Sequence, residues 1–198
     1  MKKPTLIVVC GPNGSGKTSI TRKILKHEWI ENCTYINPDE IAKDIFGDWN
    51  SPEAIIDAAN YAKELRYNLL RENKSIIFET VLSSPEKVEF IRLAKENGYF
   101  IRVFFVCTDS PTINASRIAR RVIQGGHDVP IPKIISRYSK SIANCAFLSK
   151  EVDRLYVYDN SRENKEPLLL FRSTLGSLRK TYRNIHAWAS EIYGQITH

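Results

Sequence analysis

The residues with the clearest chemistry form one continuous stretch near the start of the chain. It matches the pattern G-x-x-x-x-G-K-[ST] and consists of Gly11, Pro12, Asn13, Gly14, Ser15, Gly16, Lys17 and Thr18. An apolar run precedes it and helix-forming residues follow it, so backbone N–H groups can surround a phosphate at a helix N-terminus. In such a loop Lys17 reaches the β- and γ-phosphates and Thr18 ligates Mg²⁺. An ordinary glycine-rich turn is the alternative, and the flanking strand and helix signals favour a site for ATP and Mg²⁺.

Carboxylates stand at or just after the ends of three further expected strands. They are Asp39 with Glu40, Glu79, and Asp109. In open α/β sheets ligands bind beyond the carboxyl ends of the strands, so these acids are expected near the phosphate loop. Glu79 closes an apolar strand, where an unpaired acid would be costly to bury. Asp39 has a second interpretation, as an acid in the first turn of a helix that begins at Pro38. Asp109 is expected to cap a helix rather than to do chemistry.

A basic segment follows in the second half of the chain. Residues 116–140 contain six cations and a single acid, Asp128; the cations are Arg117, Arg120, Arg121, Lys133, Arg137 and Lys140. Arginines on two helices joined by Gly125-Gly126 could close over ATP as a lid, whereas a solvated basic face is the alternative. Adjacent helical residues point about 100° apart, so Arg120 and Arg121 cannot both face the phosphates, and the sequence does not choose between them.

Composition limits the class of protein. The chain has 198 residues, is 42% hydrophobic and 26% charged, and contains no apolar run of the roughly 20 residues that span a bilayer. We therefore expect one soluble domain over residues 1–198. The four cysteines are scattered, which predicts reduced, buried thiols; they are Cys10, Cys33, Cys107 and Cys145. The apolar run near the start is too short for a signal peptide, so we expect a cytoplasmic protein. Positive and negative charges balance over residues 1–99, so the whole +7 excess lies in residues 100–198 and implies an anionic partner.

Strand and helix signals alternate along the chain. Short β-rich runs are expected as strands at 5–10, 34–36, 75–79, 100–106 and 155–158. Helices are expected to begin near Pro52, Pro85, Pro111 and Pro132, and an apolar stripe predicts a C-terminal helix at about 174–193. The alternation predicts an α/β fold of three layers, with a central parallel five-stranded sheet and a helical lid at about 112–140.

Five motifs together cover about residues 5–161 and resemble the zeta toxin family of P-loop kinases. They are Gly11–Thr18, Asn37-Pro-Asp-Glu40, Phe78-Glu-Thr80, Arg120-Arg-Val-Ile-Gln-Gly-Gly-His127 and Tyr158-Asp-Asn-Ser161. The resemblance implies a P-loop NTPase/kinase-like fold related to nucleoside monophosphate kinases. It implies transfer of phosphate from ATP, with Mg²⁺, to the 3′-hydroxyl of UDP-N-acetylglucosamine sugars. It also implies an antitoxin protein that obstructs ATP binding.

The resemblance also assigns roles to single residues. Asp39 is similar to the general base for the substrate hydroxyl, and Glu79 to the acid that helps to hold the substrate. Asn37 and Thr80, from the same motifs, belong with the substrate. The catalytic arginines would be Arg120 or Arg121 together with Arg137, although the tandem pair and its distance from Arg137 depart from the family's spacing.

Three functions remain open on the sequence. The first is a kinase for a sugar nucleotide, and the second is a kinase for a nucleoside, a nucleotide or a shikimate-like metabolite. The third is an NTP-driven nucleic-acid-binding protein or nucleic-acid end kinase. Single-strand binding combines basic residues with stacking aromatics, and residues 116–140 offer only Tyr138, which argues against nucleic acid.

Overall fold

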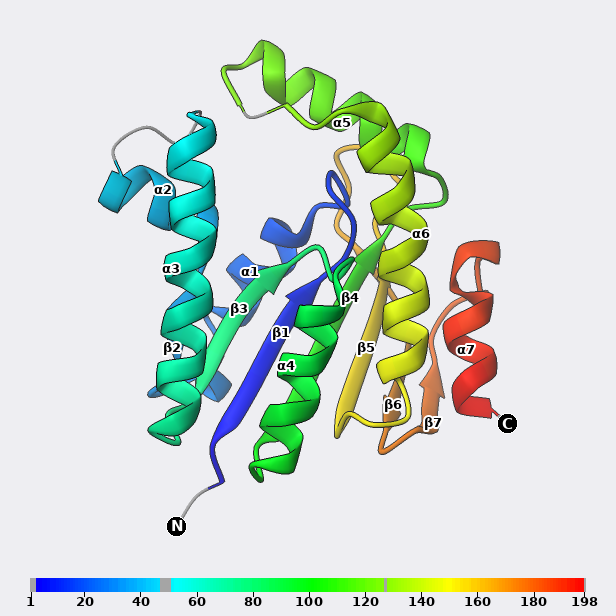
Figure 1. Ribbon diagram of the computed structural model, residues 1–198. Helices are drawn as coiled ribbons and strands as arrows, with labels where there is room; N and C mark the ends of the chain where they lie inside the picture. Colours follow the sequence, from blue (N-terminus) through cyan, green and yellow to red (C-terminus); the bar gives the residue numbers. More distant parts are fainter. Residues whose placement is uncertain (1–2, 47–50, 127, 198) are drawn as a thin grey trace.

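A computed structural model describes residues 3–46, 51–126 and 128–197 and contains one seven-stranded sheet with the order β2-β3-β1-β4-β5-β6-β7 (Figure 1). The strands are β1 (Thr5–Cys10), β2 (Thr34–Ile36), β3 (Ile76–Thr80), β4 (Phe100–Cys107), β5 (Arg154–Asp159), β6 (Leu168–Thr174) and β7 (Ser177–Thr181). Strands β1 to β5 are parallel, and β6 and β7 are antiparallel to their neighbours. Parallel strands end at one edge of the sheet, and this edge carries the phosphate loop.

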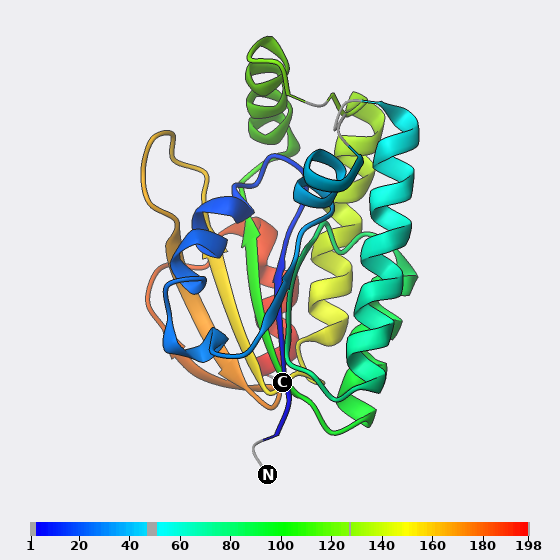
Figure 2. The ribbon, with the colours of Figure 1, turned by 90° about the vertical axis from the view of Figure 1, so that its left-hand side faces the viewer.

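Helices cover both faces of the sheet, which gives the three layers expected (Figure 2). The larger apolar core lies beneath α3 (Pro52–Arg71), α4 (Pro85–Glu96), α6 (Ile131–Leu148) and α7 (Ser190–Thr197). The smaller core, on the opposite face, lies beneath α1 (Lys17–Ile24) and the short 3₁₀ helix η1 (Glu28–Ile30). Helix α2 (Pro38–Phe46) packs against α3, α5 (Pro111–Ile123) rises above the sheet, and a second 3₁₀ turn, η2 (Ala187–Ala189), precedes α7.

The central strands form where the sequence is apolar on both faces. Residues 6–10 of β1 are fully buried, as expected for a strand covered by helices on both sides. Local signals also fix where helices begin. The side chain of Ser51 accepts a hydrogen bond from the N–H of Ala54 at 3.0 Å, and Pro52 occupies the first position of α3.

Two expectations about the C-terminal part of the chain are wrong. The sheet has seven strands instead of five, because β6 and β7 extend the predicted parallel set. No single helix spans 174–193; that stretch contains the end of β6, a tight turn, β7, η2 and the start of α7 at Ser190. Leu175 and Gly176 have φ of 47° and 71°, the type I′ geometry of a two-residue hairpin turn. Leu175 is 61% exposed at this turn, so it does not belong to a buried helical stripe.

Two further findings concern the class of protein. Within the part of the chain that the structure describes, no helix is long and apolar enough to cross a membrane. Cys10, Cys107 and Cys145 are free thiols and are buried as expected, whereas Cys33 is only partly buried. Burial raises the pKa of the Cys107 thiol to about 12, so this side chain is a neutral packing residue.

Candidate active site

The phosphate loop connects β1 to α1 and depends on its glycines. Gly11, Gly14 and Gly16 all have positive φ, between 75° and 145°. A Cβ atom at Gly11 would lie 1.9 Å from the carbonyl oxygen of Val106, and one at Gly16 would lie 2.1 Å from the Asn160 amide nitrogen. No other residue type fits at these two positions, so the loop can take a shape in which its backbone N–H groups approach an anion closely.

Two asparagines from distant segments hold this loop in place. Asn114, in α5, donates its side-chain N–H to the carbonyl oxygen of Asn13 at 2.7 Å. Asn160, just after β5, donates to the carbonyl oxygen of Ser15 at 2.8 Å. Both asparagines are buried, so the loop is fixed before any ligand arrives. The hydroxyl of Ser15 is buried without a hydrogen-bond partner among the described residues, as expected of a group that serves a bound phosphate.

Replacing Asn160 by alanine should therefore weaken both the fold and the site. The Ser15 carbonyl would be left buried and unpaired, at a cost of about 1–3 kcal/mol in the free energy of unfolding. ATP affinity should fall with it, measured by titration with a fluorescent ATP analogue. The control is Asn97→Ala, which removes an exposed hydrogen bond of 2.7 Å to the Leu93 carbonyl and should cost about 0.5 kcal/mol or less. Equal effects of the two variants would contradict the role of Asn160 in holding the phosphate loop in place.

Lys17 lies between the loop and the acidic side chains. Its Nζ donates to the carbonyl oxygens of Gly11 at 3.0 Å and Pro12 at 3.2 Å. Burial lowers the pKa of Lys17, and the negative charges of Glu79 and Asp39 partly oppose that effect. A cation held between the phosphate loop and two carboxylates is where a transferring phosphoryl group would need it. Thr18 follows with its side chain exposed at the start of α1.

A chain of hydrogen bonds connects the two expected acids. The Tyr35 hydroxyl donates to Oε1 of Glu79 at 3.0 Å and accepts from the Asn37 side-chain amide at 3.0 Å. The side-chain oxygen of Asn37 accepts the backbone N–H of Asp39 at 3.0 Å. Burial, with the Glu79 carboxylate, raises the pKa of Tyr35, so its hydroxyl keeps the proton that it donates. Sequence reasoning missed Tyr35, because a tyrosine in a short strand gives no signal of a partner 44 residues away.

The remaining expected substrate and acid residues are placed as follows. Thr80 is buried, and its hydroxyl accepts the backbone N–H of Leu82 at 3.1 Å. Asp39 and Glu40 are exposed on the first turn of α2, which begins at Pro38. Burial is the largest cause of a raised pKa at Glu40. The structure therefore brings Asp39, Glu79 and Lys17 into one electrostatic group at the edge of the sheet.

The arginines divide into two groups. Arg137, in α6, donates from Nη1 to the side-chain oxygen of Asn13 in the phosphate loop at 3.2 Å. Burial is the main cause of the lowered pKa of Lys17, and the positive charge of Arg121 adds to it. Arg120 instead pairs with Glu163, and both side chains are more than half exposed. The final residue of this motif, His127, lies outside the described residues.

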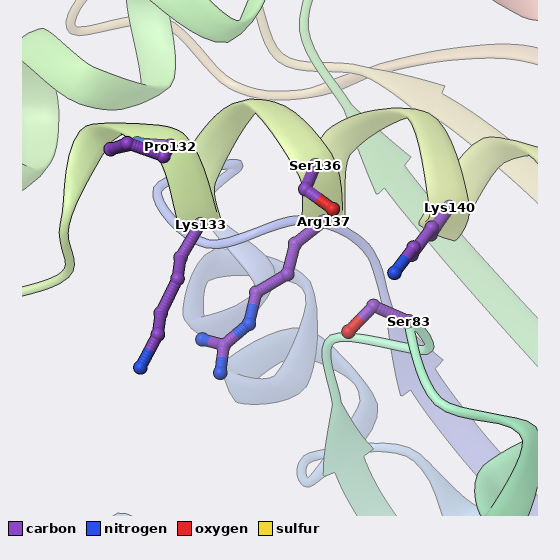
Figure 3. A pocket seen from close by; sticks show the side chains of 6 residues that line it. All are labelled: Ser83, Pro132, Lys133, Ser136, Arg137 and Lys140. Carbon is purple, nitrogen blue, oxygen red and sulfur yellow. The ribbon is translucent and has the colours of Figure 1, made fainter.

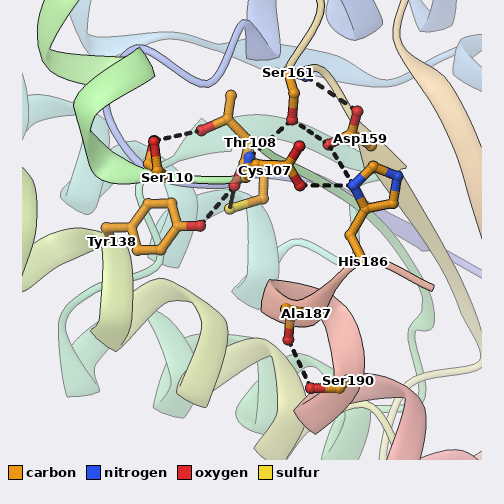
Figure 4. A network of polar contacts seen from close by, with 10 residues as sticks. Cys107, Thr108, Ser110, Tyr138, Asp159, Ser161, His186, Ala187 and Ser190 are labelled. Atoms are coloured by element: carbon orange, nitrogen blue, oxygen red, sulfur yellow. Dashed lines mark hydrogen bonds and ion pairs between the residues drawn. The ribbon is translucent and has the colours of Figure 1, made fainter.

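Asp109 takes part in a different network from the one expected. Figure 4 labels the other members of this network, Asp159, Ser161 and His186. The expected helix cap is wrong: Ser110 occupies the N-cap position of α5, and Asp109 Oδ1 lies 2.6 Å from Nδ1 of His186. The backbone N–H of Asp109 donates to the Ser161 hydroxyl at 2.8 Å, which in turn donates to the buried Asp159 at 2.5 Å. The network joins the segment after β7 to the ends of β4 and β5, next to Asn160.

The donor set fits ATP and a magnesium ion. The loop leads into the N-terminus of α1, where backbone N–H groups lack partners within the helix, and it carries the buried Ser15 hydroxyl, which has no partner among the described residues. The Thr18 hydroxyl is a hard oxygen ligand, the type that Mg²⁺ prefers. A phosphate loop at the carboxyl edge of a helix-covered parallel sheet, with arginines arriving from a separate helical segment, defines a P-loop kinase fold.

The chain belongs to the zeta toxin family. The family model described as "Zeta toxin" matches residues 1–166, which confirms the resemblance seen in the motifs. An uncharacterized protein of Haemophilus influenzae strain Rd is 30% identical over 132 residues, covering 67% of this chain and 91% of that protein.

Solved structures share the fold. A chain of the AvrRxo1-ORF1:-ORF2 complex with ATP matches with a TM-score of 0.69 at 20% identity, over 98% of this chain and 63% of that chain. A structure from the PezAT chromosomal toxin-antitoxin system of Streptococcus pneumoniae matches with a TM-score of 0.63 at 19% identity, over 98% of this chain and 79% of that chain. The chain thus spans less than two thirds of the AvrRxo1 relative.

Proposed function

We propose that this protein is an ATP-dependent kinase that transfers the γ-phosphate to a hydroxyl group of a small molecule. The observation that carries the proposal is the placement of Lys17 between a pre-formed phosphate loop and the carboxylates Glu79 and Asp39. Family membership and the kinase fold support a phosphotransferase. Phosphoryl transfer needs little covalent chemistry from the protein, so positioning and charge stabilisation at this site are sufficient for catalysis.

Each residue of the site then has a role. Gly11 to Thr18 hold the triphosphate, Lys17 neutralises charge on the transferred group, and the Thr18 hydroxyl would hold Mg²⁺, which neutralises phosphate charge when bound. Asp39 is the general base for the acceptor hydroxyl, because it is the exposed carboxylate of the pair. Glu79 holds the acceptor and is kept in place by Tyr35. Asn37 positions Asp39 through its hydrogen bond to the backbone.

The helical segment 112–140 is the lid of this kinase. Arg121 and Arg137 are its catalytic arginines, supported by the influence of Arg121 on Lys17 and by the hydrogen bond from Arg137 to Asn13. Arg120 is a solvated residue that pairs with Glu163. A small apolar cluster (Ile118, Val129 and Ile134) joins the two helices of the lid, while Tyr138 of the same segment is buried in the larger core of the sheet.

Replacing Asp39 by asparagine should lower the rate of phosphoryl transfer by about 10²–10⁴-fold, the usual contribution of a positioned general base. Carboxylate and amide have nearly the same shape, so ATP affinity should change little. Single-turnover phosphorylation measures the first quantity and fluorescent-nucleotide titration the second. The control is Asp44→Asn, an exposed acid later in α2, which should behave as wild type. A near-normal Asp39→Asn enzyme together with an inactive Glu79→Gln enzyme would exchange the roles of the two acids.

The first candidate acceptor is a sugar nucleotide such as UDP-N-acetylglucosamine, as the family resemblance implies. The experiment that tests the function presents UDP-sugars, nucleosides, small polyols and phosphorylated sugars with ATP and Mg²⁺. Phosphorus NMR then detects a new phosphomonoester. A product identifies the acceptor and the reaction together, and a complete absence of ATP binding would overturn the kinase assignment.

A partner protein also belongs to the proposal. One similar structure is a complex of AvrRxo1-ORF1 with AvrRxo1-ORF2, and another comes from the PezAT toxin-antitoxin system. We propose that an antitoxin covers the ATP site of this chain, in the cytoplasm. Such a protein should reduce ATP affinity in titration, and a partner that binds without changing ATP affinity would contradict this part of the proposal.

A further inference from the structure

Strands β5, β6 and β7 leave one face of the sheet open, on the side of α1. The register sets Phe104, Tyr156, Arg172 and Lys180 in one row across β4 to β7, each directly beside the next. Phe104 is 3% exposed, Tyr156 is half-buried, and Arg172 and Lys180 are exposed. The row therefore runs from the core beneath α1 to the edge of the sheet at β7. Helices α6 and α7 pack against the other face of these strands (Figure 1).

The open face carries a group of side chains that we call the sheet patch. Side chains alternate between the two faces along β5, so Arg154 and Tyr158 lie on the same face as Tyr156, and all three are half-buried. Beyond the end of β7, the ring of Tyr182 lies with its centroid 5.0 Å from the ammonium of Lys180. The sheet patch thus consists of three cations and three partly exposed tyrosines: Arg154, Tyr156, Tyr158, Arg172, Lys180 and Tyr182.

The positive charges of the sheet patch are not neutralised within the protein. Arg154 donates to the hydroxyl of Thr174 on β6, and among the residues that the structure describes no carboxylate forms an ion pair with any of the three cations. Arg172 and Lys180 are directly opposite each other on β6 and β7, and like charges in that arrangement destabilise a sheet. An anion bound over the two strands would remove this cost. Part of the positive excess of residues 100–198 is therefore available to an anionic ligand on this face.

We infer that the sheet patch binds single-stranded nucleic acid. The cations meet the backbone phosphates, and unpaired bases stack on the exposed parts of the tyrosine rings, which is how sheets and grooves with interleaved basic and aromatic residues hold single strands. An acidic protein segment would pair with the cations and leave the tyrosines without a role, so the aromatic residues favour nucleic acid. Residues 116–140 lack such aromatics, but the folded sheet gathers them from β5 and from the residue that follows β7. This binding is separate from the proposed kinase function.

The first test measures the contribution of the cations. A labelled uridine oligonucleotide of about 12 nucleotides is titrated by fluorescence anisotropy, with the phosphate loop saturated by a non-hydrolysable ATP analogue and Mg²⁺. Wild type should bind it, and Arg172→Ala/Lys180→Ala should bind at least about 10-fold more weakly. The slope of log K against log salt concentration should become shallower by about 1.4, because each phosphate contact on a single strand contributes about 0.7. The variant should unfold at the same or a higher denaturant concentration, since it removes a repulsive pair.

The control removes two cations from a different surface. Lys133 and Lys140 line a cationic cavity of about 350 Å³ on α6 (Figure 3), so Lys133→Ala/Lys140→Ala matches the change in net charge. This variant should keep the affinity and the salt slope of wild type. Equal weakening by both double variants would overturn the inference, because binding would then follow net charge alone. Weakening by the α6 variant only would also overturn it, as would a wild-type protein that does not bind the oligonucleotide.

The second test separates nucleic acid from an acidic protein. Tyr182→Ala should weaken oligonucleotide binding by about 5-fold or more and leave the salt slope unchanged, because stacking on a base involves no phosphate. Tyr182→Phe keeps the ring and should bind as wild type. Polyglutamate of the same length represents an acidic segment and should bind more weakly than the oligonucleotide. Polyglutamate binding as tight as that of the oligonucleotide, or normal oligonucleotide affinity in Tyr182→Ala, would overturn the assignment to nucleic acid.

Discussion

Lys17→Ala is expected to abolish ATP turnover while the protein remains folded. The Lys17 ammonium donates to two carbonyl oxygens of the phosphate loop, and the negative charges of Glu79 and Asp39 raise its pKa against the effect of burial. Without this ammonium, the charge on the transferred group is no longer stabilised. Loss of a single donor from a comparable electrostatic site lowers the catalytic rate by about 10²–10³-fold. Additional loss of nucleotide binding should bring turnover below detection.

The fold should tolerate this change. Burial lowers the pKa of Lys17, so the charged side chain costs the unliganded protein some stability, and alanine should unfold at the same or a higher denaturant concentration. Lys26→Ala, a change at an exposed lysine just beyond α1, is the matched control and should keep full turnover. Turnover near wild type in a well-folded Lys17→Ala protein would remove the basis of the kinase assignment.

The second large effect is expected at the lid arginines. Arginine offers a planar fork that binds two phosphate oxygens at once, and lysine does not. Arg121→Lys and Arg137→Lys should each lower the single-turnover rate by about 10³-fold, the scale of a catalytic arginine. Arg120→Lys should stay near wild type, because Arg120 pairs with exposed Glu163 away from the loop.

The three substitutions are conservative in charge and share one segment, so each serves as a control for the others. Circular dichroism and thermal unfolding should be the same for all three. A collapse in Arg120→Lys with a normal Arg121→Lys would reverse the assignment within the tandem pair. Three near-normal enzymes would show that the segment is only a solvated basic surface.

Most of the strands could be predicted from the local sequence. The strands at 5–10 and 34–36 have the predicted bounds. Strands β3 and β5 differ from the prediction by one residue at both ends, and β4 by one residue at its C-terminal end. The agreement is close because buried apolar runs specify a strand wherever both faces are covered. The C-terminal stretch was mistaken for a helix because apolar residues three to four apart also arise from a strand, a tight turn and a loop in succession. The turn at Leu175-Gly176 was the missing signal.

The chemistry of the site was only partly predictable. The phosphate loop and the acids are local motifs, so the sequence predicts Lys17, Asp39 and Glu79 as site residues, and their roles stay predictions. Asn114 and Asn160 were not predicted, because their hydrogen-bond partners lie 101 and 145 residues away in the chain. The choice between Arg120 and Arg121 likewise depends on Glu163, which no helical spacing reveals. What the sequence missed are contacts between segments that meet only in the folded sheet.

Asn13 connects the phosphate loop to both arms of the lid. Its carbonyl oxygen accepts from Asn114 in the first helix, and its side-chain oxygen accepts from Arg137 in the second. Any swing of either helix must therefore stretch or break a bond to the loop that surrounds the nucleotide. In the proposed kinase, opening of the lid would therefore also loosen the loop around the spent nucleotide. The rate at which ADP is exchanged for ATP would then depend on the rate of lid opening. A variant with a more rigid lid would release ADP more slowly.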